Sequence, residues 1–240
     1  MPITITQLKD LVLDILFPKI CINCREQGKY YLCQKCFSFL SEVEFTCLVC
    51  NKAEFFGERH NECKAGDSPD GCVSFWSYEG VVKKLIWESK YKSLIDIPKD
   101  LIDYGFLTIE NNSNRFSKFI NFLLEEKTII SYVPLYFKKE EERGFNQSKV
   151  AAEHLGRRVK KEVVSLLKRE KETKSQTKLD KQERFLNTKN AFSFISNKKI
   201  EQVVLIDDVL TSGATIKECT KVLKQNGVEK VWVLTLTKTI

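Results

Sequence analysis

Two adjacent carboxylates follow a short apolar run and precede a loop of hydroxyl and small side chains. The stretch is V-V-L-I-D-D-V-L-T-S-G-A-T, residues 203–215, with the acids at Asp207 and Asp208. Four consecutive apolar residues predict a strand that is buried on both faces, which is typical of the interior of a parallel sheet. The carboxyl ends of such strands open into the crevice where α/β proteins bind ligands. We therefore expect the acid pair to lie in a ligand site.

The loop after the acid pair has the composition of a phosphate site. Residues 216–223 show helical spacing of apolar side chains, so the loop ends at a helix N-terminus, whose free N–H groups and positive dipole end suit a phosphate. Glycine permits close backbone approach and hydroxyls can donate hydrogen bonds. Carboxylates suit sugar hydroxyls or a hydrated Mg²⁺ instead. Together they describe a ribose 5-phosphate site, with the phosphate at Thr211, Ser212, Gly213, Ala214 and Thr215.

Two other interpretations of the acid pair are less well supported. An apolar strand ending in two aspartates could be a Walker B strand, but the sequence has no G-x-x-x-x-G-K-[ST] motif to hold a triphosphate. The pair could also be an ordinary strand end with capping acids. The adjoining loop of hydroxyls and glycine disfavours that interpretation.

Cysteines form a second group of residues that could take part in chemistry, as metal ligands. Eight of the nine lie between Cys21 and Cys72. Disulfides are disfavoured in a reducing compartment, so the cluster calls for metal or for burial. Two C-x-x-C turns lie close together and can complete one tetrahedral zinc site. The predicted ligands are Cys21, Cys24, Cys33 and Cys36.

A third C-x-x-C turn, at Cys47 and Cys50, needs two further ligands for a second zinc site. His60 and Cys63 repeat the same spacing, so a Cys₃His site is the most economical prediction. A site that uses Cys72 in place of His60 is the main alternative, although Cys72 also suits a buried core thiol. Ligands could also be exchanged between the two sites. Both sites would be structural, and the segment should depend on metal for its fold.

Composition permits one good core and a small second module. The chain has 240 residues, 42% of them hydrophobic, and a net charge of +7. No apolar run approaches the roughly 18 residues of a membrane span. Residues 8–16 follow helical spacing and lack the basic start and cleavage site of a signal peptide, so an amphipathic helix packed on the body is expected. We expect a cytoplasmic protein without membrane insertion.

Strand and helix patterns alternate in the rest of the chain, which predicts an α/β domain with a mainly parallel sheet flanked by helices. Residues 110–115 are predicted to be an exposed loop. We expect an N-terminal helix and double zinc ribbon over residues 1–71 and the α/β domain over residues 72–240. The predicted strands are 73–78, 129–134, 203–208 and 231–236, and the predicted helices are 81–91, 147–159 and 214–227.

The stretch V-L-I-D-D-V-L-T-S-G-A-T resembles the phosphoribosyl-pyrophosphate (PRPP) motif of type I phosphoribosyltransferases, with Ser212 where threonine is commoner. The whole chain resembles the ComF family, a zinc ribbon joined to a phosphoribosyltransferase domain. The paired C-x-x-C turns, L-I-W-E-S-K-Y, E-R-G-F-N-Q and the acid-pair loop carry this resemblance, which covers most of residues 14–237. Asn190 replaces a glycine that is frequent before Ala-Phe. The implied fold is the type I phosphoribosyltransferase fold with a flexible hood.

The resemblance implies further site residues. In such proteins a loop after an early strand contacts the pyrophosphate, here residues 134–147, with Arg143 favoured over Lys138 and Lys139, which could also be a solvated charge run. Asn146 and Gln147 would brace that loop. Residues 173–192 resemble the hood, which carries Thr173, Gln176, Arg184 and Asn187. Closure of the hood would exclude water, and Arg184 could reach the leaving pyrophosphate or be a surface arginine. Asp207, Asp208, Arg143 and Arg184 are the expected catalytic residues, with Mg²⁺ bound to PRPP.

Two functions follow as hypotheses. The first is transfer of ribose 5-phosphate from PRPP to an unidentified acceptor with release of pyrophosphate, or binding of a phosphoribosyl nucleotide. The second is a non-catalytic protein that binds or handles single-stranded DNA and keeps a PRPP or nucleotide site as a scaffold or sensor. The resemblance suggests it, because it implies a link to competence, its machinery proteins and DNA uptake. Residues 157–189 contain twelve Lys or Arg and five Asp or Glu, a basic window that suits either anion. Trp76, Trp87 and Tyr91 could stack bases, but core positions are favoured for them.

Overall fold

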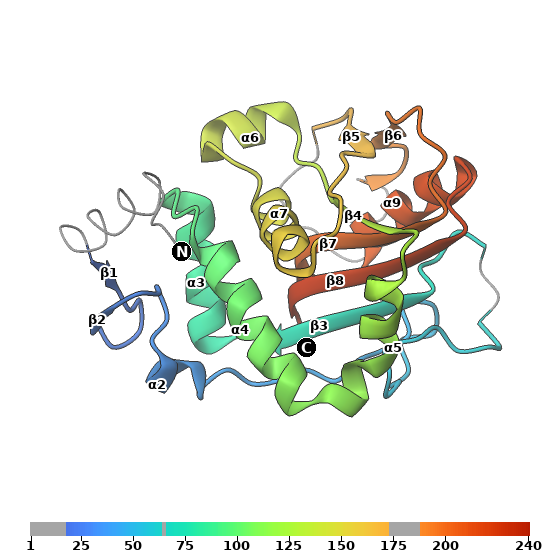
Figure 1. The fold of residues 1–240 in the computed structure, drawn as a ribbon. Coiled ribbons are helices and arrows are strands. Elements are labelled where there is room, and N and C mark those ends of the chain that lie inside the picture. The colour runs from blue at the N-terminus through green and yellow to red at the C-terminus, as the bar shows by residue number, and fades with distance from the viewer. Residues whose placement is uncertain (1–17, 64–65, 173–187) are drawn as a thin grey trace, which may run out of the picture.

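The computed structural model describes residues 18–63, 66–172 and 188–240 (Figure 1). Its centre is a sheet of four parallel strands in the order β3-β8-β7-β4. Strand β7 is hydrogen-bonded on both sides, and Val204 lies opposite both Trp232 and Ile130. The interior position predicted for this strand is confirmed. The bounds are β3 Gly71–Ser77, β4 Thr128–Tyr132, β7 Gln202–Leu210 and β8 Lys230–Lys238.

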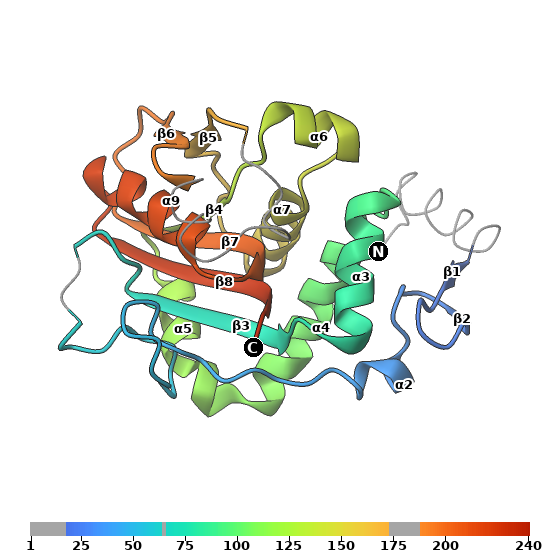
Figure 2. The ribbon, with the colours of Figure 1, turned by 180° about the vertical axis from the view of Figure 1, so that it is seen from behind.

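Alternation along β7 divides the core between the two faces of the sheet. Val204 and Ile206 belong to one buried cluster, and Val203 and Leu205 belong to the other. Figures 1 and 2 show α7 and α9 on opposite faces of the sheet. The first face is covered by α4 Ile97–Asn111, α5 Ser113–Leu124 and α7 Gln147–Val159, and the second by α9 Ala214–Gln225. The expected α/β architecture with a parallel sheet is confirmed.

The loop predicted for residues 110–115 is wrong, because two helices meet there. Helix α4 ends at Asn111 and α5 begins at Ser113. The backbone N–H of Asn112 donates to the carbonyls of Thr108 and Ile109, at 3.1 Å each. The polar run is therefore only the exposed junction of two amphipathic helices.

Further elements surround the carboxyl end of the sheet. Helix α3 spans Gly80–Tyr91 and α6 spans Phe137–Arg143, inside the segment predicted to be a loop. Strands β5 Leu167–Arg169 and β6 Phe192–Phe194 pair antiparallel. Asn190 takes a left-handed φ of 54°, which asparagine tolerates better than most residues. The rest of the expected hood, residues 173–187, lies outside the described residues, as does the helix expected at 8–16.

The cysteine-rich segment packs on the same core as the α/β domain. It contains β1 Lys19–Ile20, β2 Gln27–Gly28 and α2 Gln34–Phe37. The buried ring of Phe45 lies edge-on to Phe116 of α5, with ring centroids 5.0 Å apart. Lys238 Nζ donates to the Glu44 carbonyl at 2.9 Å. The boundary after residue 71 stays a prediction, and it falls where β3 begins.

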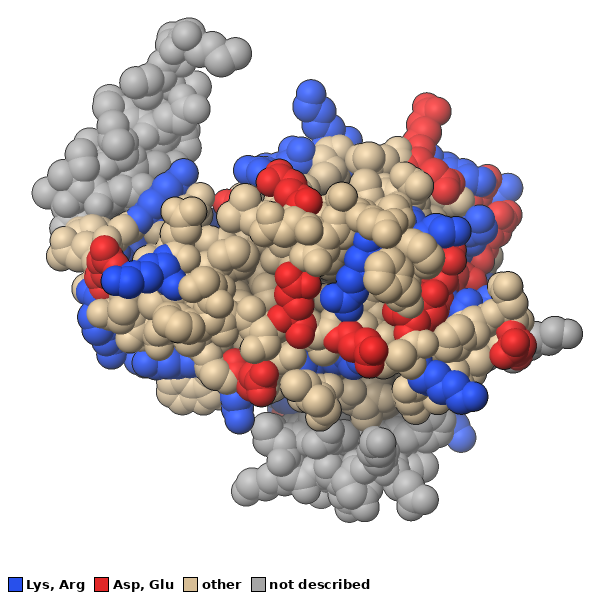
Figure 3. Space-filling view, turned by 90° about the horizontal axis from the view of Figure 1, so that it is seen from below, with Lys and Arg blue, Asp and Glu red and all other residues tan. Residues whose placement is uncertain are grey.

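Charged side chains of both signs are scattered over the face seen in Figure 3, where the described Lys and Arg are interspersed with Asp and Glu. Two cations in the described part of the basic window form ion pairs: Arg158 pairs with Asp103 at 3.5 Å and Lys168 with Glu170 at 3.1 Å. Among the helices of the described residues, none is both long enough and apolar enough to cross a membrane.

Candidate functional site

A pocket of about 570 Å³ opens where β7 ends, and Asp207 and Asp208 line it. Its walls come from α3, the α6–α7 segment, β5 and the start of α9. The position agrees with the crevice predicted from the strand pattern, although β7 continues two residues past the acids, to Leu210. The site therefore lies at a strand end in the interior of the sheet, where ligands of α/β proteins bind.

Hydrogen bonds hold the two carboxylates in different ways. Asp207 Oδ1 accepts from Ser148 Oγ and from the Asp208 backbone N–H, both at 2.9 Å. Asp208 Oδ2 lies 2.6 Å from Lys90 Nζ. Burial, with the negative charge of Asp208 beside it, raises the pKa of Asp207 to about 7. The pair is an acceptor site inside the pocket, suited to donors such as sugar hydroxyls.

The turn after β7 brings backbone N–H groups to the same pocket. Gly213 takes a left-handed φ of 74° and caps α9, which begins at Ala214. Thr211, Gly213 and Thr215 line the pocket, whereas Ser212 and Ala214 are not among its lining residues. The N-terminus of a twelve-residue helix with two hydroxyls beside it is a suitable place for a phosphate.

The Gly213 turn rests on the cysteine-rich segment. A Cβ added at Gly213 would lie 3.7 Å from Leu48 Cδ2 and 3.9 Å from Leu210 Cδ1. Leu48 is buried with Leu210 in the second core cluster, and it lies between Cys47 and Cys50. A C-x-x-C turn thus supports the predicted phosphate loop from behind.

Among the described residues that line the pocket, positive side chains outnumber the acids by five to two. Burial and the neighbouring charges of Arg169 and Arg143 lower the pKa of Lys139. Burial also lowers the pKa of Arg169. Such crowding of cations favours an anionic ligand. The five cations are Lys83, Lys90, Lys139, Arg143 and Arg169.

The residues expected to contact pyrophosphate are separated by the structure. Arg143 ends α6, lines the pocket and donates from Nη1 to Gln147 Oε1 at 3.4 Å. Lys139 lines the pocket, but Lys138 is exposed and is not among the lining residues. Asn146 caps α7, as its side chain accepts from Ser148 N at 2.9 Å, so the predicted bracing role is confirmed. Arg184 lies outside the described residues.

Sequence reasoning missed several residues of the pocket, for different reasons. Ser148 follows the E-R-G-F-N-Q motif directly, and that position could have marked it. Lys90 and Arg169 have no local signal beyond their charge. Trp87 was expected in the core and instead lines the pocket with Tyr91, whereas Trp76 is a core residue as expected.

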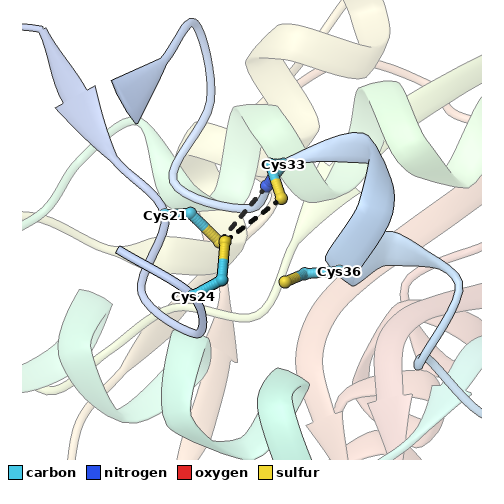
Figure 4. Close-up of side chains that lie close together, drawn as sticks. All are labelled: Cys21, Cys24, Cys33 and Cys36. Carbon is cyan, nitrogen blue, oxygen red and sulfur yellow. Dashed lines mark hydrogen bonds between the residues drawn. The ribbon is translucent and has the colours of Figure 1, made fainter. Parts of the chain in front are cut away.

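The side chains of the first cysteine set point toward one another (Figure 4). The sulfurs of Cys21, Cys24, Cys33 and Cys36 all lie within 4.8 Å of one another, and Cys24 Sγ lies 3.5 Å from Cys33 Sγ. A tetrahedral zinc with Zn–S bonds of about 2.3 Å needs sulfurs about 3.8 Å apart. The Asn23 amide donates to Cys36 Sγ at 3.2 Å, as outer partners of metal ligands do. The set fits a closed zinc site.

The second set also converges, with His60 among its members. The ligand atoms of Cys47, Cys50, His60 and Cys63 lie within 4.8 Å of one another, and Cys50 Sγ lies 3.2 Å from His60 Nδ1. Cys72 is buried in the second core cluster instead, where burial raises the pKa of its thiol to about 12. All nine cysteines are free of disulfides. The described residues therefore contain two sets of four side chains, here called tetrads, that could each hold a zinc ion.

Comparison with known proteins agrees with this geometry. Residues 144–239 match the family model described as "Phosphoribosyl transferase domain". The chain is 29% identical to Competence protein F of Haemophilus influenzae, over 91% of this chain and 96% of the relative. It is 24% identical to Competence protein ComFC of Bacillus subtilis, over 87% and 79% of the two chains. It is 35% identical to DNA utilization protein YhgH of Escherichia coli O6:H1, over 45% and 48%.

The parallel sheet, the acid pair with its hydroxyl loop and the matching model define a phosphoribosyltransferase-type α/β domain, joined to a cysteine-rich segment that fits a zinc ribbon. Two of the relatives align along most of the chain. The match to competence proteins along most of the chain, together with the matched domain model, supports the ComF family for this chain.

Proposed function

We propose that this protein binds PRPP with Mg²⁺ and transfers ribose 5-phosphate to an acceptor, with release of pyrophosphate. The observation that carries the proposal is the pocket itself, where two carboxylates and a helix N-terminus lie at the end of one strand. Asp207 and Asp208 accept hydrogen bonds from the ribose hydroxyls. Thr211, Gly213 and Thr215 hold the 5-phosphate, with Ser212 and Ala214 shaping the turn.

The reaction needs positioning and charge neutralisation more than a nucleophile. The described lining contains no cysteine or histidine. When the bond from C1 of the ribose to the pyrophosphate oxygen breaks, negative charge accumulates on the leaving group, and the acceptor forms the new bond to C1. Arg143 and Lys139 neutralise that charge from the pocket wall, which is worth most in a site without water. Lys138 and Arg184 are further candidates, and Arg184 belongs to the predicted hood, outside the described residues.

Mg²⁺ enters this scheme as part of the substrate. The acids offer the oxygen ligands that Mg²⁺ prefers, but Asp208 already pairs with Lys90 at 2.6 Å and Asp207 with Ser148 at 2.9 Å. We therefore assign Mg²⁺ to the pyrophosphate of PRPP. Zinc in the two tetrads would be structural, because four protein ligands leave no position for substrate. Clustered free thiols suit a reducing compartment, so we place the protein in the cytoplasm.

A second candidate function is handling of single-stranded DNA, alone or with proteins of the competence machinery. It is favoured by the names of the relatives, Competence protein F and DNA utilization protein YhgH, and by the exposed rings of Trp87 and Tyr91. The ion pairs of Arg158 and Lys168 weigh against the basic window as a strand-binding surface. DNA binding through charge would weaken steeply as salt rises.

Calorimetric titration of PRPP and Mg²⁺ into the zinc-loaded protein tests the first function. We expect binding by the wild type and its loss in the Asp207→Asn/Asp208→Asn variant. A Glu110→Gln/Glu126→Gln variant removes two exposed carboxylates outside the pocket and should bind like the wild type. Absence of binding to folded wild-type protein would leave the motif as a scaffold and favour the DNA function.

A further inference from the structure

The second tetrad lies against the N-terminal turn of α9, the helix that begins at the predicted phosphate loop. Leu48 directly follows the ligand Cys47 and is buried, and its Cδ2 lies 3.7 Å from the Cβ that a side chain at Gly213 would carry. Leu48 belongs to the same core cluster as Leu210 and Ile216, which flank that turn. A side chain between two candidate zinc ligands therefore packs directly behind the turn.

The same cysteine-rich segment also contacts the other end of α9. Asp70 Oδ2 lies 2.8 Å from Lys224 Nζ in the last turn of the helix, and Asp70 Oδ1 lies 3.3 Å from Arg59 Nη2. Arg59 directly precedes His60, and its Nη1 donates to the carbonyl of Cys63. The three paired side chains are mostly buried, so salt screens them less than exposed charges. The loop of the second tetrad is thus linked to both ends of α9.

The first tetrad packs on a different part of the core. Its buried ligands Cys21 and Cys36 belong to the other core cluster, together with Leu32. The backbone N–H of Tyr31 donates to Asp100 Oδ2 of α4 at 2.8 Å. The two tetrads are therefore joined to different faces of the sheet, and it is the second that packs against α9.

Bound zinc orders the loop that carries its ligands, because a short polar segment gains much of its order from the metal. Leu48 lies between Cys47 and Cys50, so its position depends on how these two ligands are held. A phosphate site at a helix N-terminus needs its N–H groups in fixed positions, and preorganisation of such a site raises its affinity. Zinc and phosphate therefore favour the same arrangement of Leu48 and the Gly213 turn.

We propose that Leu48 is a positioning residue for the phosphate loop and that it couples zinc in the second tetrad to anion binding at the Gly213 turn. This inference rests on the proposed function, in which that turn holds the 5-phosphate. The coupling is reciprocal: zinc strengthens phosphate binding, and bound phosphate strengthens zinc binding by the same factor, typically about 5- to 150-fold. Loss of this zinc weakens the site without altering any residue that contacts the ligand.

Calorimetric titration of ribose 5-phosphate into zinc-loaded full-length protein tests the role of Leu48. Leu48→Ala should weaken the affinity at least about fivefold, and Leu48→Met, which conserves side-chain volume, should retain most of it. Leu32→Ala is the matched control, because Leu32 is also buried, lies beside a ligand of the first tetrad and is not among the described pocket residues. Both alanine variants should lose stability in urea denaturation, and only Leu48→Ala should lose affinity.

Zinc binding measures the same coupling from the other side and uses the wild-type protein. The zinc-loaded protein is equilibrated with a chromophoric chelator, with and without saturating ribose 5-phosphate. We expect the sugar phosphate to raise the affinity for one of the two zinc ions at least about fivefold and to leave the other unchanged. Leu48→Ala should abolish this protection. His60→Ala removes a ligand of the second tetrad and should eliminate the protected ion.

The outcomes separate the coupling from the function beneath it. If ribose 5-phosphate does not bind the wild type, the phosphoribosyl site fails and the coupling fails with it. If it binds, but Leu48→Ala binds it equally well or neither zinc ion is protected, the coupling alone is wrong. An equal loss of affinity in Leu32→Ala would show a general effect of core truncation. Survival of the protected ion in His60→Ala would assign it to the first tetrad, and either result overturns the role of Leu48.

Discussion

Lys90 Nζ lies 2.6 Å from Asp208 Oδ2, and both side chains are mostly buried. The ion pair joins the last turn of α3 to the end of β7. It supplies a positive charge beside a carboxylate that must tolerate an anionic ligand. A buried pair of this kind is costly to break on one side only, because the remaining charge is left without compensation.

Replacement of Lys90 by methionine should weaken binding of ribose 5-phosphate by about tenfold or more, since Asp208 would then repel the phosphate without a neighbouring cation. Calorimetry measures the effect. Lys92→Met is the matched control, because Lys92 pairs with Glu88 near the same helix end and is exposed. Equal affinities for the two variants would contradict a role for Lys90 in the site.

Gly213→Ala should weaken binding of the phosphate. It should also lower the free energy of unfolding by about 1–2 kcal/mol, the cost of placing a residue with a side chain in the left-handed conformation. The added Cβ meets only ordinary contacts at 3.7 and 3.9 Å, so backbone strain is the cause. Gly227→Ala imposes the same strain at φ 92° in open space. Both variants should lose stability in urea denaturation, and only Gly213→Ala should lose ribose 5-phosphate affinity. A similar affinity loss in Gly227→Ala would point to a global effect.

The raised pKa of Asp207 predicts a pH-dependent stability. Its pKa rises from 3.8 to about 7 on folding, because burial disfavours the charged form. Between those values the folded state holds a proton that the unfolded state releases, so stability falls as pH rises through this window. Asp207→Asn removes the effect.

Urea denaturation of wild type and Asp207→Asn at intervals from about pH 4 to about pH 8 measures this linkage. The free energy of unfolding of the wild type should decrease relative to the variant as pH rises. Asp100, whose pKa burial also raises to about 7, is present in both proteins and cancels in the difference. A difference that is constant across the range would show that Asp207 is ionised normally.

Metal analysis distinguishes the ligand sets of the second tetrad. His60→Ala should lower bound zinc by one ion per chain, and Cys24→Ser should do the same for the first tetrad, because each loses one of four ligands. Cys72→Ala should leave zinc content unchanged, since that thiol lies in the core. Zinc loss in Cys72→Ala, with full content in His60→Ala, would favour the alternative ligand set.

Phe45→Ala should destabilise the whole protein by about 3–5 kcal/mol, because its buried ring packs on Phe116 in the main core. Phe55→Ala, in the same segment but exposed, should cost little. Urea denaturation followed by tryptophan fluorescence reports the α/β domain. If its unfolding midpoint is unchanged in Phe45→Ala, the cysteine-rich segment folds as a separate unit.

The parts of the site that could be predicted from the sequence are those whose residues lie close together along the chain at a recognisable spacing. The acid pair, the hydroxyl loop and both tetrads are short motifs. The strand pattern of residues 203–206 placed the acid pair at the end of a strand in a parallel sheet. Lys90 and Arg169 could not be found this way, because their approach to the acids depends on how α3 and β5 pack. The exposed junction at Asn112 concealed two helices, since its polar residues dominate the local pattern.

Leu48 packs behind the Gly213 turn, so one side chain joins the second candidate zinc site to the candidate phosphate loop. A leucine held between two thiolates of a candidate metal site forms the backing of a candidate phosphate cradle. The cysteine-rich segment therefore shares core packing with the phosphate loop, and we expect that it cannot be exchanged between relatives without its packing partners. A chimera between relatives would have to keep Leu48 and Leu210 together, because both lie behind the Gly213 turn.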